Sequence, residues 1–133
     1  MRREDRLRQR GDFRRAFAGR AVANRVAVLF RAANTVGRPR VGFAVPRSVG
    51  GAVRRNRVRR QFRAAYSGLR ARVAGACDLV FLVRPAAVGV GFAVIGSALK
   101  DLLQRSGMLG GAAGPGGAAG RGAGAPARRG DGA

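Results

Sequence analysis

The chain has 133 residues, of which 27 are lysine or arginine and 6 are aspartate or glutamate, giving a formal net charge of +21. This length suits one small domain, and so basic a chain repels itself and attracts polyanions, with nucleic acid the first candidate partner. The sequence contains no histidine and a single cysteine, Cys77, which excludes an internal disulfide and a Cys/His metal site and fits a reducing cytoplasm.

The first half of the chain predicts one short helix followed by two strands. Asp12 is suited to capping a helix of about two turns, which Gly19 can end. One strand is expected over residues 22–31, where β-branched residues are dense, and a second, antiparallel to it, over residues 41–45. Residues 34–39 between them contain asparagine, glycine and proline, which favour a turn.

The second half predicts a long helix, a strand and a final helix. The long helix covers residues 52–70 and follows two adjacent glycines. Residues 78–84 form a continuous apolar run, which is typical of a strand covered on both faces. The final helix, residues 91–105, has an apolar stripe that is expected to be buried, made of Phe92, Ile95, Leu99 and Leu102.

This order of elements predicts a single α+β domain over residues 1–106. We expect a two-layer sandwich in which three helices pack on a small, mostly antiparallel sheet of about four strands. From residue 107 to residue 133 the chain is mostly glycine and alanine, so it buries too little apolar surface to offset its ordering entropy. This segment is predicted to be a disordered tail.

The long helix contains the segment RRNRVRRQFR, residues 54–63, in which six of ten residues are arginine. On a helical projection, Val58 and Phe62 lie in an apolar stripe that can dock on the sheet, while the arginines and Asn56 flank it or form the opposite face. No acidic residue occurs in this helix, so its like charges repel at helical spacing. A phosphate backbone would relieve the repulsion, which favours nucleic-acid contact over a merely solvated face.

Three side chains have two interpretations each. Asn56 can read a base edge or a ribose hydroxyl, or it can make local backbone bonds in the first turn of the helix. Phe13 and Phe17, one helical turn apart, can belong to the core or can form a stacking platform for an unpaired nucleotide. The pattern of residues leaves these alternatives open.

No catalytic constellation is visible, because the few carboxylates are scattered and Cys77 resembles a buried, inert thiol. No glycine-rich phosphate loop indicates a small-molecule substrate. Residues 1–13 lack the apolar core of a signal peptide. The longest uncharged stretch of the predicted domain, residues 85–99, has 15 residues, short of the roughly 20 that span a bilayer. A cytoplasmic protein without a membrane segment is expected.

Residues 40–66, RVGFAVPRSVGGAVRRNRVRRQFRAAY, resemble the signature of the bacterial ribonuclease P protein subunit. The resemblance rests on an R-N-R core at Arg55-Asn56-Arg57 and on a D-F-x-x-x-F pattern from Asp12 to Phe17. The pairs Gly19-Arg20 and Arg84-Pro85 are also similar. These motifs occur in the family's order and cover almost the whole predicted domain.

The resemblance implies an endoribonuclease subunit that acts in the removal of the 5′ leader from precursor tRNA. In the family the RNA subunit carries the catalytic centre with bound Mg²⁺, so no catalytic residue and no metal ligand is expected on this chain. By resemblance, the long helix contacts the ribonuclease P RNA through Arg54, Arg55, Asn56, Arg57, Arg59, Arg60 and Arg63. The leader would contact Phe13, Phe17, Arg20 and Arg47.

The resemblance also implies that the arginine helix joins two strands in a left-handed β-α-β crossover, against the usual right-handed preference. Pro46, Ser48 and Gly51 differ from the residues common in the family, so no RNA contact is assigned to them. Two alternatives come from other classes. A structural ribosome-associated RNA-binding protein would bind ribosomal RNA without leader dependence. A membrane-active basic protein is disfavoured, since the sequence has no tryptophan and no basic amphipathic helix free of a core role.

Overall fold

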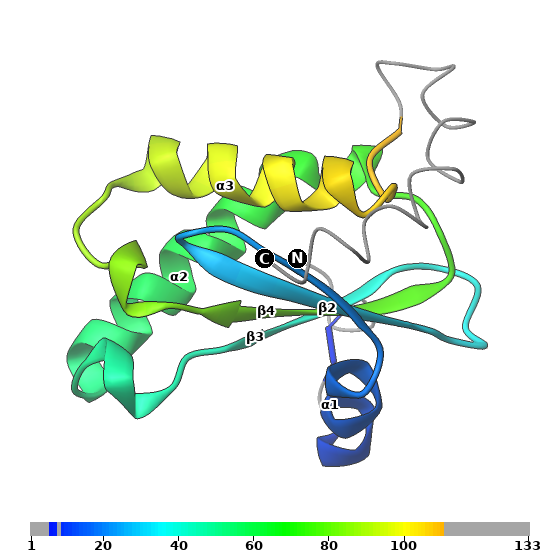
Figure 1. Ribbon diagram of the computed structural model, residues 1–133, viewed down its shortest axis with the longest axis horizontal. Helices are drawn as coiled ribbons and strands as arrows, with labels where there is room; N and C mark the ends of the chain where they lie inside the picture. The colour runs from blue at the N-terminus through cyan, green and yellow to red at the C-terminus, as the bar shows by residue number, and fades with distance from the viewer. Residues whose placement is uncertain (1–5, 8, 111–133) are drawn as a thin grey trace.

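The computed structural model describes residues 6–7 and 9–110, which contain three α-helices and four strands (Figure 1). The helices are α1 (Arg10–Phe17), α2 (Ala52–Leu69) and α3 (Phe92–Arg105), and the strands are β1 (Arg20–Ala23), β2 (Ala27–Ala33), β3 (Arg40–Ala44) and β4 (Cys77–Val83). Short 3₁₀ turns lie at Arg47–Val49, Arg70–Arg72 and Pro85–Ala87. The predicted α+β class, with three helices and four strands, is confirmed.

The strands form one sheet in the order β1-β2-β4-β3. Strand β2 pairs antiparallel with both β1 and β4, whereas β3 pairs parallel with β4. Since parallel neighbours need a crossover connection, α2 joins β3 to β4 in the predicted β-α-β unit. The hand of this crossover stays a prediction. Strands β2 and β3 run in opposite directions as predicted, but β4 lies between them.

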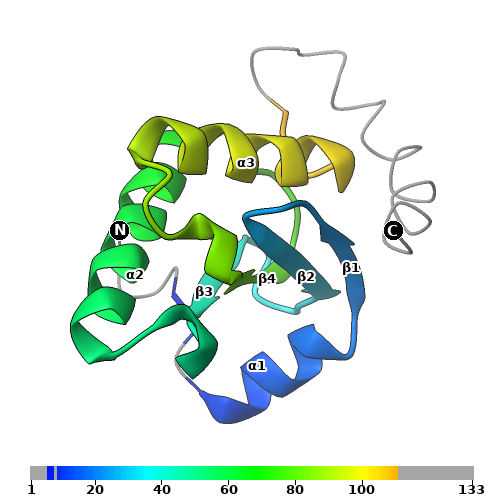
Figure 2. The same ribbon diagram turned by 60° about the vertical axis from the view of Figure 1, so that its left-hand side comes forward.

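The helices cover both faces of the sheet. Helices α2 and α3 lie side by side on one face, and α1 lies on the other (Figures 1 and 2). The predicted two-layer arrangement therefore describes α2 and α3, while α1 adds a partial third layer. On this second face Ala16 of α1 is buried against Val80 of β4, with Leu7 completing a small apolar cluster.

The main core lies between the sheet and the α2–α3 layer. Four aromatic rings meet there: the Phe43 ring centroid lies 5.8 Å from that of Phe81, 6.2 Å from that of Tyr66 and 6.4 Å from that of Phe62. Helix α2 contributes the predicted stripe, in which Val58, Phe62, Ala65 and Tyr66 are buried. This packing fixes which side of α2 faces solvent.

The strand predicted over residues 22–31 is wrong as a single element, because Asn24 reverses the chain between β1 and β2. Its side-chain oxygen accepts hydrogen bonds from the N–H groups of Val26 at 3.0 Å and Ala27 at 3.1 Å. Its amide donates to the Ala98 carbonyl of α3 at 3.0 Å. An asparagine that bonds the backbone two residues on is a turn former, which the flanking β-branched residues concealed.

Helix α1 begins at Arg10, so the predicted role of Asp12 as its N-cap is wrong. Gln9 occupies the cap position and Asp12 lies in the first turn, where a carboxylate also interacts favourably with the helix dipole. The helix ends before Gly19, as predicted. A Cβ atom at Gly19 would lie 2.0 Å from the Arg31 carbonyl oxygen, so the close approach of β2 requires glycine there.

The buried stripe of α3 is confirmed at Ile95, Leu99 and Leu102, which are fully buried. The prediction is wrong for Phe92, whose side chain is 55% exposed. The whole first turn of α3 is exposed, so the core begins one turn later, at Ile95.

The folded chain continues to Gly110, four residues beyond the predicted domain boundary. The Ala74 N–H donates to the Met108 carbonyl and the Gly110 N–H donates to the Arg72 carbonyl, each at 2.8 Å. Met108 is buried. The rest of the predicted tail, residues 111–133, lies outside the described residues.

Candidate nucleic-acid interface

The seven side chains predicted to contact the ribonuclease P RNA all lie on α2, and we call residues 54–63 the arginine ridge. Because Val58 and Phe62 hold the helix to the core, the other side chains point away from it. Four of the seven are exposed (Arg54, Asn56, Arg57 and Arg60), and three are half-buried (Arg55, Arg59 and Arg63).

The charge of the arginine ridge is not balanced within the described part of the chain. The ion pairs there are made by Asp12, Asp78 and Asp101, and each of these carboxylates pairs with an arginine outside α2. The first turn of α2 contains no acidic residue, and its cap residue, Gly51, has no side chain that could accept a hydrogen bond from the first N–H groups. The ridge therefore retains its attraction for a polyanion.

Two hydrogen bonds order the ridge from within. The Arg55 Nε donates to the Gly50 carbonyl at 3.1 Å, and the Arg59 Nη1 donates to the Asn56 side-chain oxygen at 2.9 Å. The alternative interpretation of Asn56 was a local hydrogen bond to the backbone. Its side chain makes no such bond within the described residues. It stands exposed on the ridge, oriented by Arg59.

A groove of about 340 Å³ lies along one flank of the ridge, and we call it the N-terminal groove. The N-terminal segment forms one wall, because the Leu7 N–H donates to the Val41 carbonyl of β3 at 2.8 Å. The groove is lined by Arg6, Leu7, Phe13, Val41, Gly42, Phe43, Arg59 and Arg63. Three guanidinium groups thus surround an apolar floor.

The arginines of the N-terminal groove are electrostatically crowded. Burial lowers the pKa of the Arg63 guanidinium, and the positive charges of Arg6 and Arg59 lower this pKa further. The Nε atoms of Arg6 and Arg63 are buried without a hydrogen-bond partner among the described residues. An anion in the groove would supply both the missing acceptor and the missing counter-charge.

The two phenylalanines of α1 occupy different environments. Phe13 is half-buried, packs with the small cluster of Leu7 and Val80, and lines the N-terminal groove. Phe17 is 38% exposed, and its ring stands edge-on to Phe30 with the centroids 4.9 Å apart. Phe13 therefore packs in the apolar cluster and also lines the groove, while the ring of Phe17 is partly accessible to a ligand.

Beside Phe17, α1 leaves part of the sheet uncovered. Val28, Leu82 and Ala44 are register partners in one row across β2, β4 and β3. All three are half-buried. This row extends the apolar surface from α1 across the sheet.

The two arginines predicted to contact the leader lie at opposite edges of the sheet. Arg20 begins β1, at one edge, whereas Arg47 follows β3, at the other. Both are exposed. They therefore flank the α1 face instead of forming one cluster.

Arg40 connects α1 to the sheet, a role that no sequence pattern indicates. Its guanidinium donates to both carboxylate oxygens of Asp78, each at 2.9 Å, and lies 3.5 Å from the Asp12 carboxylate. The Asp78 hydrogen bond is the main cause that raises the pKa of Arg40. Asp12 also pairs with Arg15 of its own helix. The network fixes α1, and with it Phe13 and Phe17, against the sheet.

The described residues offer neither a metal centre nor a membrane-spanning helix. They contain no group of three or more histidine, cysteine, aspartate or glutamate residues arranged to hold a metal ion. None of their helices combines the length and apolar character that crossing a membrane requires.

Comparison with known proteins agrees with the geometry. The model of the Ribonuclease P family matches residues 1–107. The chain is 39% identical over 111 residues to the ribonuclease P protein component of Symbiobacterium thermophilum, covering 82% of this chain and 96% of that protein. It is 37% identical over 103 residues to the component from Acidothermus cellulolyticus, covering 75% and 86%.

The fold also matches solved structures. The RNase P protein of Thermotoga maritima superimposes with a TM-score of 0.69 at 30% identity, covering 75% of this chain and 96% of that one. The RNase P protein of Staphylococcus aureus gives a TM-score of 0.73 at 25% identity, covering 80% and 98%. The basic ridge, the fold and the match over nearly all of the described residues agree, and the chain belongs to the bacterial ribonuclease P protein family.

Proposed function

We propose that this chain binds the catalytic RNA of ribonuclease P and the 5′ leader of precursor tRNA, and so promotes endonucleolytic removal of the leader. The observation that carries the proposal is the arginine ridge, whose charge has no counter-charge within the described residues. The bond-breaking chemistry is assigned to the RNA, with Mg²⁺ that the RNA holds. The protein contributes binding and positioning.

The ridge and its N-terminal groove are the proposed contact for the ribonuclease P RNA. Arg57 and Arg60 are exposed and can grip phosphates with two parallel hydrogen bonds. A phosphate in the N-terminal groove would partner the buried Nε donors of Arg6 and Arg63 and would lie close to the charge of Arg59. Asn56, which can donate and accept, is the proposed reader of a base edge or ribose hydroxyl.

The α1 face is the proposed contact for the leader. A single strand binds through stacking of its bases on aromatic rings and attraction of its backbone to basic groups, and each stacked base contributes about 1–3 kcal/mol. Phe17 supplies an exposed ring, the row of Val28, Leu82 and Ala44 supplies apolar surface, and Arg20 and Arg47 supply positive charge at the two edges. Mature tRNA lacks the leader, so these contacts would favour the precursor.

The test is reconstitution. Purified chain is added to a bacterial ribonuclease P RNA at a Mg²⁺ concentration at which the RNA alone is slow, and cleavage of precursor tRNA is measured. Stimulation of cleavage at the mature 5′ end is expected. Absence of stimulation at every protein concentration would refute the proposal.

Leader dependence separates this proposal from general RNA binding. The affinity of the reconstituted complex is measured for precursor tRNA and for mature tRNA of the same sequence. Tighter binding of the precursor is expected. Equal affinities, together with binding to ribosomal RNA, would favour a ribosome-associated protein instead.

A further inference from the structure

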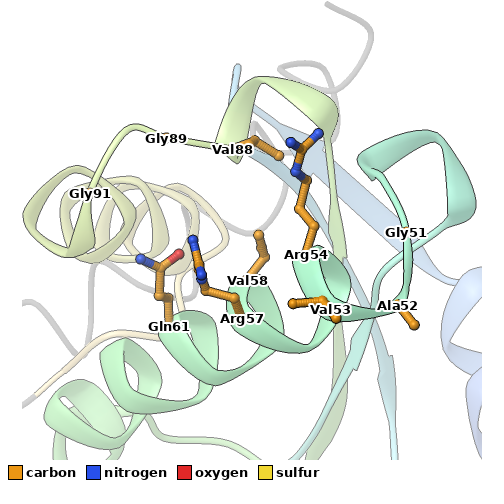
Figure 3. A pocket seen from close by; sticks show the side chains of 10 residues that line it. All are labelled: Gly51, Ala52, Val53, Arg54, Arg57, Val58, Gln61, Val88, Gly89 and Gly91. Atoms are coloured by element: carbon orange, nitrogen blue, oxygen red, sulfur yellow. The ribbon is translucent and has the colours of Figure 1, made fainter.

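A second and larger groove, of about 890 Å³, lies along the other flank of the arginine ridge (Figure 3). It runs between the first three turns of α2 and the loop that leads into α3, and we call it the loop groove. Its lining residues are Gly51, Ala52, Val53, Arg54, Arg57, Val58, Gln61, Val88, Gly89 and Gly91. Its volume lies within the range of about 300–1,000 Å³ typical of sites for single small molecules.

The charged side chains that line the loop groove, Arg54 and Arg57, are both positive. Arg54, Arg57 and Gln61 reach from α2 toward the loop, with Val58 between the two arginines (Figure 3). None of these three polar side chains makes a hydrogen bond or ion pair with another described residue, and no acidic residue lines the groove. The site therefore combines two positive charges with a side-chain amide that can both donate and accept.

The rest of the lining is apolar or open. Val58 is buried at the floor, Val88 is half-buried, and Val53 is 77% exposed. Gly89 and Gly91 have φ angles of +81° and +90°, which favour glycine, and a Cβ atom at either would meet no atom within 4 Å. At Gly89 and Gly91 the loop therefore presents backbone without a side chain, which leaves room for a flat group to approach.

We infer that the loop groove binds one unpaired nucleotide of the ribonuclease P RNA, with its base against the Val58–Val88 wall and its phosphate on Arg54 and Arg57. This inference rests on the proposed function and adds a site on the flank of α2 opposite the N-terminal groove. Gln61 is positioned to hydrogen-bond the edge of the base. A paired base is stacked in a helix and cannot enter a groove, so the occupant comes from a loop or bulge.

The first experiment locates the nucleotide. The chain is bound to a bacterial ribonuclease P RNA, and the Watson–Crick edges of unpaired bases are probed with dimethyl sulfate for adenine and cytosine and with a carbodiimide for guanine and uracil. We expect at least one unpaired base to lose reactivity in the complex. With Gln61→Ala, the same base should recover its reactivity while the protections elsewhere remain, because the substitution removes only the bond to the base edge.

The second experiment compares two substitutions of equal charge. Val53→Glu places a carboxylate at the mouth of the groove, and the loss of one base contact and one phosphate contact predicts about tenfold weaker binding of the RNA. Val36→Glu makes the same change at another exposed valine, in the turn between β2 and β3. It should change the affinity by no more than about twofold. Both side chains are exposed, and thermal unfolding verifies that both variants fold.

The outcomes separate the inference from the proposed function. If the unaltered chain stimulates cleavage but no base responds to Gln61→Ala, the nucleotide site is overturned and the proposed function stands. Equal losses of affinity for Val53→Glu and Val36→Glu would also overturn the nucleotide site, because they would show that the added negative charge acts only through general electrostatic repulsion. If the unaltered chain fails to bind the RNA, the proposed function itself fails.

Discussion

The Arg40 guanidinium grips the Asp78 carboxylate through two hydrogen bonds of 2.9 Å each. Arg40 begins β3 and Asp78 lies in β4, so the pair joins the two parallel strands that α2 connects. The Asp78 side chain is 4% exposed and that of Arg40 is 21% exposed. The pair is thus shielded from solvent on the face that α1 covers.

Arg40→Ala is expected to destabilise the fold by about 3–5 kcal/mol, because it leaves a buried carboxylate without its cation. Urea unfolding measures the loss. The control is Arg105→Ala, which breaks a pair with Asp101 whose side chains are 35% and 46% exposed, together with one hydrogen bond to the Ala23 carbonyl. An exposed pair contributes about 0–1 kcal/mol. Equal losses in the two variants would show that Arg40 has no special structural role.

Gly42→Ala is expected to displace α1. A Cβ atom at Gly42 would lie 2.6 Å from the ring of Phe13, so the ring must move. Overpacking of this kind costs about 1–3 kcal/mol, and weaker binding of precursor tRNA should accompany it. Unfolding and binding are both measured.

Gly96→Ala provides the control for that substitution. Gly96 lies inside α3, and a Cβ atom there would meet nothing within 4 Å. Since alanine is the better helix former, this variant should gain about 0.5–1 kcal/mol. Destabilisation by both substitutions would contradict the contact with Phe13.

Phe17→Ala should separate binding from folding. Its ring is 38% exposed and packs edge-on against Phe30, so its removal should lower the free energy of unfolding by only about 0.5–1.5 kcal/mol. The affinity for precursor tRNA should fall by about 1–3 kcal/mol if one leader base stacks on the ring, and that for mature tRNA should not change. Phe13→Ala is expected to destabilise the fold as well. Equal losses for precursor and mature tRNA with Phe17→Ala would remove Phe17 from the leader contact.

Arg60→Ala should lower the salt dependence of RNA binding. If Arg60 contacts one phosphate, the slope of log affinity against log salt concentration should shrink by about one. Lys100→Ala removes the same charge from an exposed position on α3 and should leave the slope unchanged. An unchanged slope for Arg60→Ala would show that Arg60 contacts no phosphate and is only solvated.

Cys77 should react slowly in the native protein. Burial is the main cause that raises the pKa of its thiol, so less reactive thiolate forms at mildly alkaline pH than in the unfolded chain. The neutral thiol contributes stability that is complete below the unfolded pKa of about 8.5 and is lost as the pH rises through the higher folded value. Alkylation rates with and without urea measure the first effect. Comparable rates would contradict it.

The sequence predicted best where local pattern decides structure. The apolar stripe of α2 follows helical spacing, so the spacing alone predicts that Val58 and Phe62 face the core, where both are buried. The turn at Asn24 was missed, because its hydrogen bonds reach both the next residues and Ala98 of α3. Propensity averaged over the flanking residues cannot register such a contact.

The grooves beside α2 could not be predicted from the chain in order. Arg6 meets Arg63 only because β3 pairs with the N-terminal segment. Gln61 and Gly89 line one groove only because the 85–91 loop returns beside α2. The arginines alone predicted an RNA-binding surface on α2. The two grooves, one on each flank of the helix, depend on tertiary contacts that the spacing of residues along the chain does not reveal.

The aromatic cluster of the main core has a spectroscopic consequence. Tyr66 is the only tyrosine of a chain without tryptophan, so the intrinsic emission excited at wavelengths that phenylalanine does not absorb arises from one ring. That ring is 2% exposed and packs from α2 against Phe43 and Phe81. It lies on the buried side of α2, whereas Arg54, Asn56, Arg57 and Arg60 of the ridge are exposed. A change in its emission therefore reports how firmly α2 sits on the sheet, without a label on the surface that we propose binds RNA.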